Sequence, residues 1–268
     1  MDKYEPLWLN LGYMLPGSFD CFMDRIKLAY PEGSEHPKPL EGIHVRVPHF
    51  GKTESVEFLN SILRFGPGSY MHTIVHQLVR KGLVRDVPVR AAPYDFRLGL
   101  GENSYIQPIW SEMINISVVG MFCSITELLP SPEVFGDEVL VKTSSREFTS
   151  SEYEEVFQYA DCPECLLNFH KVIKPNIKFP GVNTTCIHGV GISTPSKVEY
   201  LVDNPDGPFK MLKGDGDGTV NAESLSFCQR WNDVKDQYTF NYITIPGSNH
   251  DGLIKDTRTV EKILKYTF

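Results

Sequence analysis

The sequence has no run of 18 consecutive apolar residues, which excludes a membrane-spanning helix. It also has no excess of basic residues, because the formal net charge is −8 and the sequence pI is near 5.5. Proteins that bind nucleic acid neutralise phosphates with stripes of Lys and Arg, and no such stripe is present. We therefore expect no nucleic-acid partner. Internal repeats and low-complexity segments are absent as well.

The first residues, MDKYEPLWLN, do not resemble a secretory leader, because they include acidic residues and have no apolar core. We therefore expect no signal peptide in this chain. Two sequons, Asn115-Ile-Ser and Asn183-Thr-Thr, predict glycosylation only if the chain enters the secretory pathway. The cysteines are compatible with either redox compartment. They are Cys21, Cys123, Cys162, Cys165, Cys186 and Cys228.

What is present is an ordinary globular composition, with 41% hydrophobic and 22% charged residues in a chain of 268. This length fits one large domain or two small ones. Apolar residues at helical spacing over 74–79, followed by Gly82, predict a helix with a glycine C-cap. The β-prone run over 83–91 predicts a strand after it. Residues 98–184 show no sustained period, and we interpret them as an insertion or cap.

The C-terminal part predicts a helix, a strand and a second helix, the ending of a doubly wound α/β sheet. Thr239–Ile245 is rich in β-branched and aromatic residues and predicts the strand. Asp256 is the expected N-cap of the last helix. The first helix is predicted from apolar residues at three-residue intervals, namely Ala222, Leu225, Cys228 and Trp231. The last helix has Val260, Ile263 and Leu264 on its inner face.

Two loops of this C-terminal unit suggest a hydrolase. Asp217 lies in Gly214-Asp-Gly-Asp-Gly-Thr-Val220, before the first predicted helix, and His250 follows the predicted strand. In an α/β hydrolase the catalytic acid and histidine follow late strands in this order. The carboxylate would orient the imidazole, which would act as general base and then acid. A simple turn and a surface histidine are the alternatives.

Two other motifs that the sequence suggests do not match their required patterns. Asp215 and Asp217 suggest a calcium loop, but Thr219 and Val220 stand at its fifth and sixth positions. Gly51-Lys-Thr suggests a phosphate-binding loop, but Arg46 replaces the glycine that such a loop requires.

Cys162-Pro-Glu-Cys165, with His170 nearby, suggests half of a zinc site. No second pair of ligands follows at a usual spacing, so we favour structural or incidental thiols.

A nucleophilic serine is the missing part. No serine has Gly at both the second position before it and the second position after it, as a nucleophile elbow requires. Ser193 has Gly191 before it, but Pro195 follows it, and neither a strand-like run nor a helix flanks it. We therefore do not assign Ser193 as the nucleophile.

Several blocks together resemble the lecithin–cholesterol acyltransferase and lysosomal phospholipase A2 family. They are the segments His44–Phe58 (HVRVPHFGKTESVEF) and Leu83–Arg97 (LVRDVPVRAAPYDFR), the DGDGTV loop and the loop that contains His250. The resemblance covers residues 5–112 and about 128–268. It implies an α/β-hydrolase fold with a cap insertion and a Ser–Asp–His triad that takes an acyl chain from a phospholipid.

By the same resemblance, Asp217 is the triad acid, His250 is the triad base, and Cys186 and Cys228 form a disulfide. The implied partners are a glycerophospholipid and a sterol, another lipid alcohol or water as acyl acceptor. Binding to a membrane or lipoprotein surface would be peripheral, the location secreted or lysosomal, and no cofactor or metal is expected.

This chain departs from the family's pattern. Between Met113 and Ser117 the family has several dozen further residues, including the strand and helix that carry the G-x-S-x-G serine. We expect the family's first strand to be missing as well. We therefore expect one incomplete α/β-hydrolase domain over residues 1–268, with the cap at about 113–184. Because the serine is lacking, we expect such a chain to be inactive as written, and we leave its classification as an enzyme open. The alternative is a non-catalytic lipid-binding pseudoenzyme.

Overall fold

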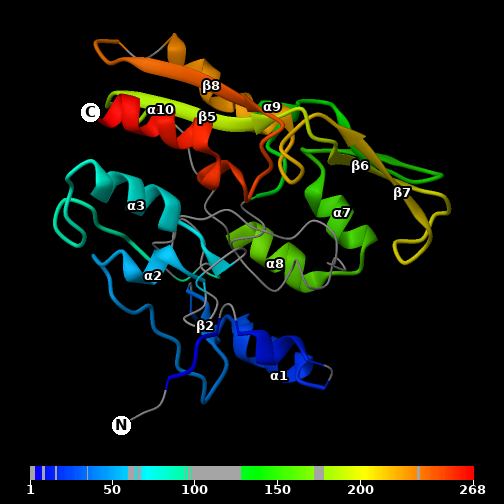
Figure 1. Ribbon diagram of the computed structural model, residues 1–268. Helices are drawn as coiled ribbons and strands as arrows, with labels where there is room; N and C mark the ends of the chain where they lie inside the picture. The colour runs from blue at the N-terminus through cyan, green and yellow to red at the C-terminus, as the bar shows by residue number, and fades with distance from the viewer. Residues whose placement is uncertain are drawn as a thin grey trace. The chain divides into compact units, whose positions relative to one another are not determined.

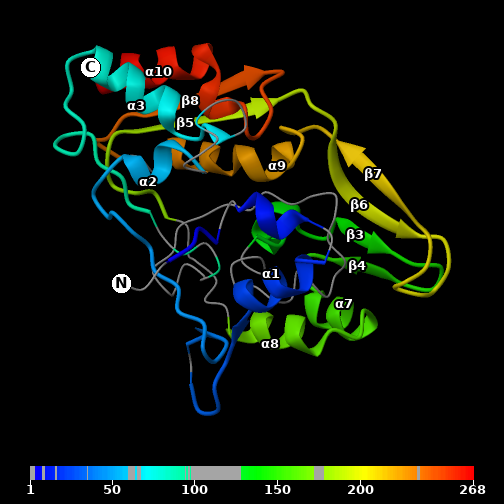
Figure 2. The ribbon, with the colours of Figure 1, turned by 60° about the horizontal axis from the view of Figure 1, so that its bottom comes forward.

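The computed structural model describes most of the chain, in two compact units. Unit 1 comprises Met1–Ile106 and Val260–Phe268, and unit 2 comprises Gln107–Thr259. The residues not described are 1–3, 8–9, 16, 35, 60–63, 65–67, 94, 96, 98–127, 172–177 and 234–235. Figures 1 and 2 show the ribbon from two sides.

Two parallel strands of unit 2 position the loops that matter for function. β5 (Thr184–Val190) pairs with β8 (Phe240–Pro246) over all seven residues, and Figure 1 shows them side by side. Because the strands are parallel, both end at the same edge of the sheet, where the loops after residues 190 and 246 begin. The strand predicted over 239–245 is thereby confirmed.

A second sheet of unit 2 has the strand order β4-β3-β6-β7. β3 and β6 are parallel, whereas the other neighbours are antiparallel. Figure 2 shows the hairpin of β6 and β7 beside β3. The strands are β3 (Val139–Lys142), β4 (Glu147–Thr149), β6 (Thr194–Tyr200) and β7 (Phe209–Gly214).

The apolar core of unit 2 lies between this sheet and two helices. α7 (Tyr153–Tyr159) and α8 (Pro163–Lys171) pack with Leu140 of β3. Cys162 and Cys165 belong to this core and form a disulfide. Both thiols are therefore unavailable as zinc ligands, and the structural alternative for the CPEC motif holds. α6 (Pro132–Phe135) precedes β3 and begins at the N-cap Ser131.

The helix predicted from apolar residues at three-residue intervals is confirmed, and most of it is a 3₁₀ helix. α9 (Ala222–Leu225) lasts one turn, and η4 (Ser226–Asn232) continues it. A 3₁₀ helix has three residues per turn, so residues three apart lie on one face. The three-residue spacing of the apolar side chains is therefore typical of a 3₁₀ helix.

Unit 1 is built from short elements and the C-terminal helix. α3 (His72–Arg80) matches the predicted helix, and Gly82 follows it with φ +99°. α10 (Thr257–Thr267) is the predicted last helix, and Asp256 accepts a hydrogen bond from the N–H of Arg258. The remaining elements are η1 (Leu11–Met14), α1 (Phe19–Ile26), β1 (Leu28–Ala29), β2 (Lys38–Pro39) and α2 (Glu54–Glu57), with η5 (Leu253–Lys255) in unit 2.

The strand predicted over 83–91 is wrong. This segment makes only the isolated bridge between Arg85 and Val89, and Asp86 has φ 60°. The Asp86 carboxylate accepts hydrogen bonds from the N–H and the hydroxyl of Thr53, just before α2. These polar contacts fix a turn where apolar patterning alone favoured a strand.

A buried carboxylate joins α2, α3 and this turn. Glu57 is 4% exposed, and Arg85 donates hydrogen bonds to its two oxygens at 2.9 and 3.1 Å. His72 Nδ1 lies 2.7 Å from Oε2 of the same carboxylate. Burial alone would raise the pKa of Glu57, but these hydrogen bonds outweigh it and lower the pKa to about 2.

We expect Glu57→Gln to lower the free energy of unfolding by about 3 kcal/mol near neutral pH. A carboxyl whose pKa is lowered by folding stabilises the folded chain above its ordinary pKa of 4.5. That contribution is lost as the pH falls from this value toward about 2. Urea unfolding at several pH values measures both effects.

Glu54→Gln is the matched control, because Glu54 is an exposed residue of the same helix. It should change the unfolding free energy by less than about 0.5 kcal/mol. Equal losses in the two variants, or a loss for Glu57→Gln that does not shrink in acid, would contradict the assignment.

Within the described ranges, no helix is both long and apolar enough to cross a membrane.

Candidate active site

The loop after β7 carries Asp217 in a tight, hydrogen-bonded turn. Asp217 N–H donates to the carbonyl of Val220, and Gly216 forms a bridge with Asn221. Gly218 has φ +93°, which a residue with a Cβ adopts only under strain. The glycine-rich sequence is therefore what allows the chain to turn directly beside the carboxylate.

The Asp217 carboxylate is buried and fully hydrogen-bonded. The residue is 2% exposed, and Oδ1 accepts from the backbone N–H groups of Thr219 at 3.0 Å and Val220 at 2.8 Å. The second oxygen, Oδ2, lies 2.8 Å from His250 Nδ1. Backbone groups thus fix one oxygen and leave the other to the imidazole.

His250 reaches this carboxylate from the loop after β8. Gly247 has φ +72° at the turn that follows the strand, and its N–H donates to the carbonyl of Val190, the last residue of β5. The backbone N–H of His250 donates to the Asp217 carbonyl at 2.9 Å. His250 is therefore tied to Asp217 through both its main chain and its ring.

Glycine is required where β5 passes behind the pair. A Cβ at Gly189 would lie 1.9 Å from the carbonyl oxygen of Ser248 and 3.2 Å from the Asp217 Cβ. No side chain fits in that space. A substitution at Gly189 would push apart the two loops that carry Asp217 and His250.

The electrostatics favour an ionised acid and a basic imidazole. Burial alone would raise the pKa of Asp217, but the hydrogen bonds from His250, Val220 and Thr219 lower it below its ordinary value. The hydrogen bond to Asp217 raises the pKa of His250 above its ordinary value, and burial offsets part of this rise. With Asp217 ionised, Nδ1 carries the donated proton, which leaves Nε2 to accept one.

A buried carboxylate that holds an imidazole is the arrangement of the acid and base in a Ser–Asp–His triad. An imidazole that is oriented by a buried carboxylate takes a proton from a nucleophile and returns it to the leaving group. Among the described residues, no serine hydroxyl hydrogen-bonds to His250. Ser193 is exposed after β5, and the hydroxyl of the buried Ser248 is directed to Asp256. The junction at 113–117, where the sequence predicts the missing serine segment, lies outside the described residues.

A disulfide closes the chain around these loops. Cys186 of β5 bonds to Cys228 of η4, with their Cα atoms 6.6 Å apart. Cys21 is free and exposed. Asn183 of the second sequon is exposed just before β5, and Asn115 of the first is not described. Glycosylation therefore stays a prediction.

Two polar residues at the site escaped the sequence reading. Thr194, buried at the start of β6, contacts the Asp217 loop, and Asp215 accepts from the N–H groups of Gly191 and Gly216. From its sequence context, Asp215 suggests only a calcium ligand. In the described part of the chain, no group of three or more His, Cys, Asp or Glu side chains is placed to hold a metal.

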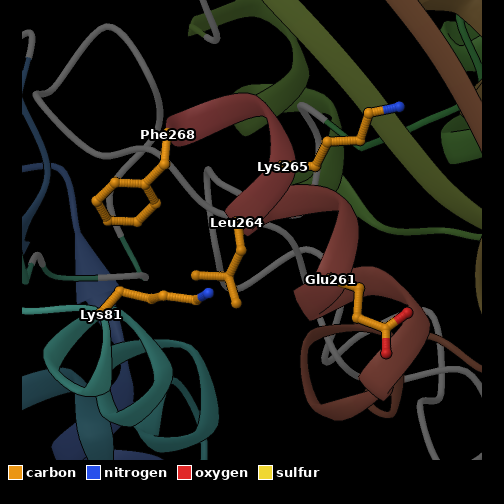
Figure 3. Close-up of a pocket in the computed structure, with 5 residues that line it drawn as sticks. All are labelled: Lys81, Glu261, Leu264, Lys265 and Phe268. Carbon is orange, nitrogen blue, oxygen red and sulfur yellow. The ribbon is translucent and has the colours of Figure 1, made fainter.

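Unit 1 contains a shallow pocket of about 320 Å³ that has no catalytic group of this kind. Figure 3 shows Leu264 and Phe268 of the C-terminal segment facing Lys81, which follows α3. Glu261 and Lys265 complete its lining. It contains neither Asp217 nor His250.

Comparisons with known proteins agree with the sequence resemblance. The chain matches the family described as Lecithin:cholesterol acyltransferase over residues 4–109 and 165–261. It is 28% identical to the lysosomal phospholipase A and acyltransferase of Mus musculus over 337 residues, which cover 97% of this chain and 81% of the mouse protein. It is 28% identical to the phosphatidylcholine-sterol acyltransferase of Gallus gallus over 314 residues, covering 88% of this chain and 75% of that protein.

Proposed function

Because the chain belongs to the lecithin:cholesterol acyltransferase family, we propose that Asp217 and His250 are the acid and base of its Ser–Asp–His triad. The observation that carries this proposal is the 2.8 Å contact between His250 Nδ1 and the buried Asp217 carboxylate. In the complete triad the serine would take the acyl chain of a glycerophospholipid and pass it to a sterol, another lipid alcohol or water. Mixed α/β architecture and the parallel β5–β8 pair are compatible with an α/β-hydrolase domain.

The absence of a nucleophile in this chain is the second part of the proposal. No serine of the sequence has the flanking glycines of an elbow. The alignment with the mouse protein runs over 337 residues, which is longer than the 268 residues of this chain. The family match is also interrupted between residues 109 and 165. These observations support an internal segment that the relatives have and this chain lacks, with the serine in it.

For the sequence as written, we therefore propose a chain that has the lipid-binding part and the acid–base pair of a phospholipid acyltransferase but forms no acyl-enzyme. A non-catalytic lipid-binding protein is the second candidate, favoured by the same intact pair without a serine. We propose peripheral binding to a membrane or lipoprotein surface, in a lysosomal or extracellular setting, for either candidate.

The test restores the missing segment. We define the completed chain as this chain with the residues that the mouse protein has between the counterparts of Met113 and Ser117 inserted there. We expect it to release fatty acid from phosphatidylcholine vesicles at least about 10⁴-fold faster than the parent chain, because it regains a nucleophile. Released fatty acid and acyl transfer to an added lipid alcohol are measured together.

The matched control is the completed chain with the serine of the inserted G-x-S-x-G motif replaced by Ala. Its rate should return to that of the parent. A parent chain that already matches the completed chain would refute the missing nucleophile. A folded completed chain that binds vesicles without hydrolysing them would favour the non-catalytic candidate.

A further inference from the structure

Two loops of unit 2 are braced against each other beside Asp217. One follows β5 and leads into β6 at residue 194, and the other spans Gly214–Val220 after β7. Ile192 forms a parallel bridge with Asp217, and the N–H of Ile192 donates to the Gly216 carbonyl at 3.0 Å. The position of the Asp217 backbone therefore depends on the first loop as well as on its own turn.

Thr194 is the side chain at the centre of this contact. The residue is 0% exposed, and its hydroxyl donates to the Ile192 carbonyl at 2.8 Å. The same hydroxyl oxygen accepts from the N–H of Gly218, also at 2.8 Å. A hydroxyl has one proton and two lone pairs, so it makes both bonds at once.

Both neighbours of Asp217 in the chain meet this hydroxyl. Gly218 is held by the hydrogen bond, and a Cβ placed on Gly216 would lie only 2.5 Å from Thr194 Oγ1. Because Gly218 is hydrogen-bonded to this buried oxygen and Gly216 packs closely against it, the hydroxyl constrains the backbone from which the Asp217 side chain projects. That side chain brings Oδ2 to His250.

We propose that Thr194 is a positioning residue of the Asp217–His250 pair, whose hydroxyl holds the Asp217–Gly218 peptide so that the carboxylate faces the imidazole. This inference rests on the proposed function of the pair. It adds the first residue of β6, which lies outside the two loops that carry the pair. Thr194 acts through the backbone of its neighbour.

The alternative is that Thr194 only stabilises the fold. Thr143 serves as the control that distinguishes the two roles, because it is another buried, hydrogen-bonded threonine of unit 2. It is 4% exposed, and its hydroxyl oxygen accepts from the backbone N–H groups of Arg146 at 2.9 Å and Ser145 at 3.2 Å. These bonds lie in the turn between β3 and β4, away from His250.

The experiment measures the titration midpoint of His250 by NMR in the full chain, following the proton on Cε1 of its ring. The signal is assigned by its loss in His250→Gln. Among the described residues, the charged groups that act on His250 are Asp217 and Asp251. In Thr194→Val the hydroxyl is lost at nearly constant volume, so we expect the Asp217 carboxylate to move away from the ring and the midpoint to shift downward.

Thr194→Ser retains the hydroxyl and should titrate like the parent. Thr143→Val should lose stability without moving the midpoint. If Thr194→Val does not fold, the smaller Thr194→Ala is measured in its place. The positioning role would be overturned if the titration midpoint of His250 did not move in the folded Thr194→Val or Thr194→Ala variant. It would also be overturned if Thr143→Val shifted the midpoint by the same amount.

Asp217→Asn separates this inference from the proposed function. It removes the negative charge, so the midpoint of His250 should fall at least as far as in Thr194→Val. If Asp217→Asn leaves the midpoint unchanged, the proposed pair itself fails. If Asp217→Asn lowers it and Thr194→Val does not, only the role of Thr194 fails.

Discussion

Replacing His250 by Ala in the completed chain is expected to lower its acyl-transfer rate by about four to six orders of magnitude. The imidazole is the group that accepts the serine proton, and no other base among the described residues is bound to Asp217 in its place. Binding of phospholipid vesicles should persist, because the substitution removes one proton acceptor and leaves the rest of the chain unchanged. Initial rates of fatty-acid release, with vesicle sedimentation alongside, measure the two effects separately.

Asp217→Asn should give a smaller loss, of about four orders of magnitude. The amide remains able to pack in the buried site, but it no longer stabilises the imidazolium or holds its Nδ1–H donor. His170→Ala is the control, because His170 is a half-exposed histidine of α8 in the same unit. It should retain the parental rate. Retained activity in either His250→Ala or Asp217→Asn would disprove the triad assignment.

The pairing of Asp217 with His250 could be anticipated because it depends on order along the chain. A glycine-rich acidic loop and a histidine after the strand Thr239–Ile245 are local signals. The parallel pairing of that strand with β5 brings the ends of both strands to the same edge of the sheet. The role of Thr194 could not be anticipated. Its hydroxyl matters only because Gly218, distant in sequence, folds back onto it.

The strand expected over 83–91 is a case in which the local sequence pattern predicted the wrong structure. Apolar and β-branched residues favour a strand wherever the backbone is free to pair. Here Arg85 and Asp86 are instead bound to Glu57 and Thr53, in a different part of unit 1. The local sequence pattern indicates the secondary structure that a segment favours. Hydrogen bonds to residues distant in sequence can outweigh that preference, as they do here. The cap over about 113–184 and the single-domain organisation, which the family resemblance implies, remain predictions.

The Cys186–Cys228 disulfide is expected to be the largest single covalent contribution to stability. We expect the double variant Cys186→Ala/Cys228→Ala to lose about 4 kcal/mol of unfolding free energy. The bond joins residues 42 apart, so it removes much of the freedom of a long loop from the unfolded chain. That loop contains β6, β7 and Asp217. Urea unfolding of parent and variant near neutral pH measures the loss.

The chain supplies its own control in the disulfide Cys162–Cys165. These residues are only 3 apart, so the same chain-entropy reasoning gives about 2 kcal/mol for Cys162→Ala/Cys165→Ala. Both half-cystines lie in the core beside Tyr153 and Phe157, so packing losses are present in this variant too. A greater loss from the 42-residue bridge therefore isolates the effect of loop length. Equal losses would mean that packing around the sulfur atoms, rather than restriction of the unfolded chain, accounts for the stabilisation.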